Sequence, residues 1–146
     1  MSDLTGSQLL FMGAKRGCVG DITTAVTSQG VDVNARDELG NTPMHYAAGS
    51  GHADAIAELL RLGADVSLTN NVGDTPLHKA ACRGNVPAVK ALVAAGAAVD
   101  AQNSLGQTPK DLATNFPAAL DELVPATDED FSNLIDSDDE NDGEYY

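Results

Sequence analysis

The sequence predicts an all-α fold: a solenoid of helix–turn–helix units with short β-turn hairpins between them, followed by a disordered acidic tail. Three observations predict it. Residue types recur every 33 positions, Thr-Pro pairs stand where helices would begin, and apolar residues between them are spaced for one face of a helix. Because a unit of this size cannot bury its apolar face alone, neighbouring units must stack.

Glycines and Thr-Pro pairs define the 33-residue period. Each unit that carries them has one glycine shortly before its Thr-Pro pair, and the two full units have another at each predicted helix end. The positions that establish the period are Gly40, Gly73 and Gly106 and the Thr-Pro pairs at 42–43, 75–76 and 108–109.

Each Thr-Pro pair predicts the start of a unit's first helix. The threonine hydroxyl can accept a hydrogen bond from a backbone N–H that otherwise has no partner, and proline suits the first helical position. Paired alanines at 47–48 and 80–81 follow and permit close approach of neighbouring helices. Gly51 and Gly84 predict the helix ends, since glycine adopts the left-handed conformation found there.

A second helix is predicted in each full unit. Ile56, Leu59 and Leu60 have the i, i+3, i+4 spacing of an apolar stripe, and the same spacing recurs in the next unit at 89, 92 and 93. Gly63 and Gly96 predict the ends of these helices. Polar segments that end in glycine then predict the turns, at 37–40, 70–73 and 103–106.

The first and last units depart from the pattern. Residues 8–11 (Gln-Leu-Leu-Phe) stand where the first unit would carry its Thr-Pro motif, and the interval between the glycines at 17 and 30 is one residue longer than in the next unit. The last unit is expected to break off at Phe116-Pro117. Terminal units of a stack are expected to differ, because one face of each meets water.

These residues resemble the ankyrin repeat family, which is marked by a 33-residue unit containing T-P-L-H-x-A. Residues 75–80 match that motif at every position, and the preceding unit differs only at Met44. The resemblance implies two full repeats between a degenerate first repeat and a truncated last one. The expected boundaries are 1–6 for a flexible N-terminus, 7–124 for the repeat domain (7–36, 37–69, 70–102 and 103–124), and 125–146 for the tail.

Negative charge is concentrated at the C-terminal end. The chain has 146 residues, 8 Lys and Arg against 22 Asp and Glu, and a formal net charge of −14. Such a balance argues against a surface that grips nucleic acid or an anionic membrane, so we expect neither as a partner. Residues 125–146 contain acids but no Lys or Arg, and they cannot bury enough apolar surface to offset the entropy of ordering. The acids are Asp128, Glu129, Asp130, Asp136, Asp138, Asp139, Glu140, Asp142 and Glu144.

No pattern of catalytic or metal-binding residues emerges. His45 and His78 lie one unit apart without acids or cysteines at ligand spacing, and the resemblance implies that they hydrogen-bond to the threonine three residues earlier. We therefore expect no enzyme activity and no cofactor. Cys18 and Cys82 do not make a disulfide scaffold, which favours a reducing compartment, the cytoplasm or the nucleus.

The resemblance implies a monomeric module that binds another protein through its turn tips and concave face. We expect a small adaptor, inhibitor or escort whose client is basic, such as a transcription factor or a ribosomal protein. Five of the eight Lys and Arg fall on this surface, which is either a solvated face with incidental charge or a cationic groove with Tyr46 as aromatic anchor. The expected contact residues are Lys15, Arg16, Arg36, Leu39, Tyr46, Ser50, Val72, Asp74, Lys79, Arg83 and Leu105, and Asn41, Gly49 and Cys82 belong to the same wider surface.

The tail carries its own candidate sites. Phe131, Leu134 and Ile135 are spaced as in segments that fold on a partner, and Thr127 and Ser137 precede acidic runs that suit phosphorylation. The tail is either a solubilising extension or a contact for the basic surface of a client. As an alternative, it folds onto the cationic groove and competes with an acidic ligand. An enzyme and a purely structural spacer are the remaining alternatives.

Overall fold

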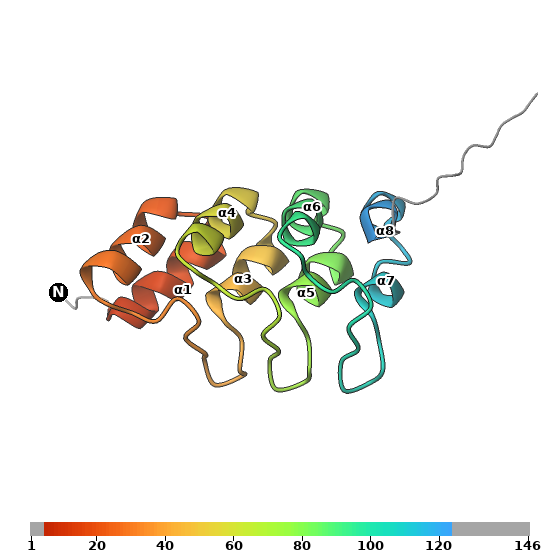
Figure 1. Ribbon diagram of the computed structural model, residues 1–146, viewed down its shortest axis with the longest axis horizontal. Helices are drawn as coiled ribbons and strands as arrows, with labels where there is room; N and C mark the ends of the chain where they lie inside the picture. The colour runs from red at the N-terminus through yellow and green to blue at the C-terminus, as the bar shows by residue number, and fades with distance from the viewer. Residues whose placement is uncertain (1–4, 124–146) are drawn as a thin grey trace, which may run out of the picture.

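The computed structural model describes residues 5–123, which form two parallel rows of short helices with hairpins along one side (Figure 1). Each helix contacts the next helix of its own row. The inner row consists of α1 (Gly6–Arg16), α3 (Pro43–Ser50), α5 (Pro76–Cys82) and α7 (Pro109–Leu112). The outer row consists of α2 (Val19–Thr23), which continues into the π-helix η1 (Thr24–Ser28), and of α4 (Ala53–Arg61), α6 (Val86–Ala94) and α8 (Pro117–Leu123).

The all-α solenoid predicted for the repeats is confirmed, and no β-strand occurs in residues 5–123. The expectations for residues 1–4 and for the tail at 125–146 concern parts of the chain outside the described residues. The same holds for the candidate sites Thr127, Phe131, Leu134, Ile135 and Ser137.

Reciprocal side-chain bonds start the inner helices. In α3, the Thr42 hydroxyl accepts from the N–H of His45, and the Thr42 N–H donates to His45 Nδ1 at 3.1 Å. The same box occurs at Thr75 and His78 in α5. Each box satisfies two backbone or ring groups that would otherwise lack partners. The Thr-Pro positions therefore start helices as predicted.

The first repeat begins earlier than the sequence pattern indicated. Thr5 and Gln8 form a capping box, so α1 starts at Gly6. Thr5 and Gly6, expected to lie in a flexible N-terminus, are therefore part of the first repeat. The extra residue between Gly17 and Gly30 is accommodated in η1, where the Gln29 N–H donates to the carbonyl of Thr24, five residues earlier, at 3.2 Å. A π-turn is a common way to absorb one additional residue without breaking a helix.

The last repeat does not break off at Phe116-Pro117, as the sequence had indicated. Residues 113–116 form the turn between α7 and α8, and Pro117 opens α8. Ala119 and Leu123 of α8 are buried, and α8 packs against α6. The fourth unit therefore has both helices, although α7 is a single turn.

The hydrophobic core runs along the seam between the two rows. Ala47, Ala48, Ala80 and Ala81 are fully buried and keep the inner helices close together, as α3 and α5 make extensive contact. The larger fully buried side chains come from both rows: Leu10, Ile22, Met44, Ile56, Leu59, Leu77, Val89 and Leu92. This continuous core shows why no unit could be stable alone.

The histidines of the capping boxes also bind each repeat to the next. His45 Nδ1 accepts from Thr42, so its Nε2 carries the proton and donates to the carbonyl of Asp74 at 2.7 Å. His78 makes the equivalent bond to Gln107 at 2.8 Å. Each imidazole therefore fixes the following hairpin relative to the helix before it.

Candidate protein-binding face

Three apolar side chains form a row along the hairpin tips. Leu39, Val72 and Leu105 occupy the same position in successive hairpins and are 63%, 55% and 81% exposed. They account for three of the four exposed large hydrophobic residues in the described part of the chain. We call these three residues the tip row. A regular exposed apolar row is a feature typical of interaction surfaces.

Hydrogen bonds within each hairpin and between neighbouring hairpins fix the position of the tip row. In the second hairpin, Asn70 Oδ1 accepts from the N–H groups of Val72 and Asp74, each at 3.0 Å. Neighbouring tips are also bonded to each other, because Asn71 N–H donates to Leu39 O and Ser104 N–H donates to Val72 O, both at 3.0 Å. The row is therefore ordered before any partner binds, which lowers the entropic cost of binding.

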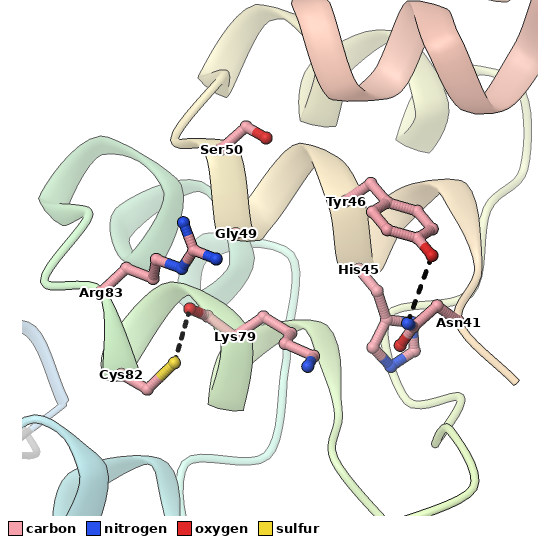
Figure 2. Close-up of a pocket in the computed structure, with 8 residues that line it drawn as sticks. All are labelled: Asn41, His45, Tyr46, Gly49, Ser50, Lys79, Cys82 and Arg83. Carbon is pink, nitrogen blue, oxygen red and sulfur yellow. Dashed lines mark hydrogen bonds between the residues drawn. The ribbon is translucent and has the colours of Figure 1, made fainter. Parts of the chain in front are cut away.

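Beside the hairpins, the inner helices α3 and α5 enclose a hollow of about 190 Å³. We call it the α3–α5 hollow (Figure 2). Lys79 and Arg83 extend into it from α5 and its C-terminal end, Arg83 toward Ser50 and Lys79 toward His45. The lining residues are Asn41, His45, Tyr46, Gly49, Ser50, Lys79, Cys82 and Arg83. Four of the expected contact residues, Tyr46, Ser50, Lys79 and Arg83, are thus brought together.

Tyr46 is held by neighbours on both sides. Its hydroxyl donates to Asp37 Oδ2, its ring meets Phe11 edge-on with centroids 5.7 Å apart, and Lys15 Nζ lies 4.6 Å from the ring centroid. A half-buried tyrosine with a bonded hydroxyl is rigid. It can still serve as a binding anchor, but Lys15 lies against its ring and does not line the α3–α5 hollow.

The pKa shifts around Tyr46 agree with this bonding. Burial and the hydrogen bond to Asp37 raise the pKa of Tyr46 above its ordinary value. Burial would raise the pKa of Asp37, but the bond from Tyr46 and the amides of Asn41 and Leu39 outweigh it and lower that pKa. Tyr46 therefore stays neutral and Asp37 stays ionised near pH 7, which preserves the bond.

The other expected contact residues lie apart from the hollow. Arg36 Nη1 donates to the carbonyl of Thr69 at 2.8 Å, so this guanidinium joins two hairpins. Asp74 Oδ1 accepts from Asn103 at 2.9 Å, and Asp74 Oδ2 lies 3.9 Å from Lys79 Nζ. Arg16 is exposed at the end of α1. The expected cationic groove is therefore a mixed surface whose cations gather at the α3–α5 hollow.

Sequence reasoning missed several members of this surface. Phe11 and Asp37, which hold Tyr46, were not expected to do so, because the degenerate first repeat hides its register. The sequence pattern also did not predict that His45 lines the hollow. A Thr-x-x-Gln pattern at residues 5–8 is the signal that would have placed the first repeat correctly.

His45 is unsuited to metal binding. Both ring nitrogens are used in hydrogen bonds, to Thr42 and to Asp74. Burial lowers the pKa of His45 below its ordinary value, and Lys79 and Arg36 act in the same direction, whereas the Asp74 carbonyl opposes them. Within residues 5–123, no three His, Cys, Asp or Glu side chains are grouped so as to hold a metal ion. No helix in that range is long and apolar enough to cross a membrane.

Repeated helix pairs, bonded hairpins and histidine bonds across two of the three seams define a helical repeat solenoid of the ankyrin type. The family model described as "Ankyrin repeats (3 copies)" matches residues 9–103 and 53–130, and the chain belongs to this family. Ankyrin repeats are protein–protein interaction modules, and the chain is such a module.

The chain is similar to "Ankyrin repeat domain-containing protein 49" of Mus musculus. The two are 37% identical over 54 residues. The aligned part is 37% of this chain and 23% of the mouse protein, so the chain matches less than a quarter of that relative's length.

Proposed function

We propose that this chain is a small, non-catalytic adaptor, inhibitor or escort that binds one client protein through its tip row and inner face, with the acidic tail engaging a basic surface of the client. The observation that carries the proposal is the tip row. Leu39, Val72 and Leu105 are each more than half exposed, one repeat apart and fixed by backbone bonds.

The tip row supports client binding for two reasons. Exposed apolar side chains cost free energy in water, and covering them with a partner recovers it, at about 25 cal/mol per Å² of buried apolar surface. The hairpins also need little reordering, because Asn71 and Ser104 already bond neighbouring tips together. A client with a complementary apolar strip would therefore gain affinity without a large entropic penalty.

Charge supports the second contact in this proposal. The nine acids and absent bases of residues 125–146 suit a basic surface, such as that of a nucleic-acid-binding client. The proposed active form is a monomer. Cys18 and Cys82, both exposed free thiols, suit a reducing compartment, so we place the protein in the cytoplasm, the nucleus or both.

The first experiment tests the tip row. The triple variant Leu39→Ser, Val72→Ser, Leu105→Ser should fold normally, because all three side chains are exposed, and should lose clients that the wild-type chain retains in quantitative affinity purification. A control variant places three serines at exposed alanines of the outer row or its ends, and it should retain them. The control substitutions are Ala57→Ser, Ala94→Ser and Ala95→Ser. Equal client recovery by both triple variants would refute the proposal.

The second experiment tests the tail. In a full-length variant called the neutral-tail chain, the nine acids of residues 125–146 are replaced by Asn and Gln. Isothermal titration of a purified basic client into wild-type and neutral-tail chains is carried out over a salt series. The wild-type affinity should fall more steeply with salt, because its charges are screened. Equal affinities and equal salt slopes would remove the tail from the proposed function.

A further inference from the structure

We propose that the α3–α5 hollow binds a carboxylate side chain of an acidic peptide segment, with Lys79 and Arg83 as the recognising cations. The inference rests on the proposed function and deepens it, because it names the chemistry of one contact on the same face. The acidic segment comes either from a client or from this chain's own tail, and the experiment below separates these sources.

Cation placement is the first argument. Lys79 and Arg83 are four residues apart, so they project from the same side of α5 and its C-terminal end. Arg83 is exposed, and no ion pair involves it among the described residues. Lys79 has one acidic neighbour, Asp74, at a loose 3.9 Å, and this carboxylate also accepts from Asn103. Both cations can therefore turn toward an incoming carboxylate.

Open space is the second argument, and it comes from Gly49. Corresponding positions in the neighbouring repeats carry side chains, Lys15 and Cys82. Gly49 lies inside α3 without a positive φ, and a Cβ placed there would have Lys79 Cβ as its nearest neighbour, at 3.8 Å. Neither backbone conformation nor packing requires glycine, which is a poorer helix former than alanine. Because Gly49 has no side chain, the space between α3 and α5 stays open as the hollow.

The size and polarity of the hollow suit one carboxylate side chain. Its volume of about 190 Å³ exceeds the roughly 150 Å³ of an engineered cavity that admits benzene. The Ser50 hydroxyl and the Asn41 amide add neutral polar groups to its wall, and the α5 side supplies the charge. The C-terminal end of a helix favours cations in any sequence. That preference accounts for Lys79 and Arg83 but not for the space in front of them.

The test uses the isotope-labelled neutral-tail chain and a synthetic peptide with the sequence of residues 125–146. Amide resonances are followed by NMR as the peptide is added. We expect saturable shifts at Gly49, Ser50, Lys79 and Arg83, which weaken in high salt. A neutral peptide, with Asn and Gln replacing the acids, is the matched ligand control and should leave these resonances unchanged.

Three variants of the neutral-tail chain assign the binding to the hollow. Arg83→Gln should weaken peptide binding roughly tenfold, as expected for loss of one charge-assisted hydrogen bond. Lys90→Gln removes the same charge from α6 in the outer row and should bind normally. Gly49→Leu fills the hollow and should abolish the shifts without lowering the unfolding midpoint, because leucine is a good helix former. A binding loss in a variant of undiminished stability cannot come from misfolding.

A comparison of the wild-type and neutral-tail chains identifies the source of the carboxylate. If the tail occupies the hollow, the Gly49 and Arg83 resonances differ between the two chains and the wild-type chain binds added peptide more weakly. If a client supplies the carboxylate, the two chains bind the peptide equally.

No saturable shift at millimolar acidic peptide, or equal binding by the Arg83→Gln and Lys90→Gln variants, would overturn the inference. That failure would leave client binding by the tip row standing. Failure of the proposed function would instead appear as unchanged client recovery in the tip-row variant.

Discussion

Replacing one hairpin glycine by alanine should reveal how much neighbouring hairpins stabilise each other. Gly73 and Gly106 occupy the same position in successive hairpins, with φ of +81° and +74°. A Cβ at Gly73 would lie 2.9 Å from the backbone nitrogen of Ser104, whereas a Cβ at Gly106 meets nothing within 4 Å. The two substitutions therefore share the conformational cost and differ in the contact between hairpins.

The magnitudes follow from these two terms. An L-residue in the left-handed region costs about 1–2 kcal/mol, which we expect for Gly106→Ala. Gly73→Ala should cost this amount plus about 0.5–1.5 kcal/mol, because its Cβ pushes away the Ser104 N–H that donates to Val72 O at 3.0 Å. The total for Gly73→Ala is about 1.5–3.5 kcal/mol. Its urea midpoint should consequently fall by about 1–2 M.

Urea unfolding followed by circular dichroism at the helix band measures both variants. Gly49→Ala serves as the opposite control: this glycine lies inside α3, and an added Cβ would make only an ordinary contact with Lys79 Cβ at 3.8 Å, so its replacement should stabilise the chain by about 0.5–1 kcal/mol. Equal destabilisation by Gly73→Ala and Gly106→Ala would show that the hairpin contact contributes nothing. A larger effect at Gly106 would refute the reasoning outright.

Three further predictions concern the core, Tyr46 and pH. Leu59→Ala removes a fully buried side chain and should lower the free energy of unfolding by about 2–5 kcal/mol in the same assay; an unchanged midpoint would contradict its burial. Tyr46→Phe removes the bond to Asp37 and should cost about 1 kcal/mol, with a rise in the pKa of Asp37 detectable by NMR titration. Burial lowers the pKa of His45, so below about pH 6.5 the unfolded chain binds more protons than the folded chain. Stability should therefore fall as pH drops from 6.5 to the lower folded pKa, and a pH-independent midpoint between 7 and 5 would argue against a buried neutral His45.

The sequence alone predicted helix boundaries correctly where individual capping residues determine them. The Thr-Pro pairs and the glycines at 51 and 84 placed the starts and ends of α3 and α5 correctly, because caps depend on residues close together in the chain. The first repeat was misplaced because it uses a different cap, Thr5 with Gln8, and takes up its extra residue in a π-turn. Neither feature follows the 33-residue period.

The candidate site was only partly predictable. Leu39, Val72 and Leu105 could be placed on the tips from the period alone. The grouping of the cations could not, because side-chain direction across repeats is not encoded by the period. Arg36 turns to the carbonyl of Thr69 in the next hairpin, and Lys15 lies on a tyrosine of the following repeat.

The seam bonds made by the histidines have a consequence for the length of the array. His45 and His78 each reach forward to the repeat that follows. The fourth unit carries Asp111 at this position, and within residues 5–123 the hydrogen bonds of Asp111 at the helix start join it to its own Thr108. That unit can accept a neighbour's bond but offers none onward. In a stack lengthened by duplication, an aspartate-to-histidine change at position 111 would supply this bond to the added unit, as His45 and His78 do for the units that follow them.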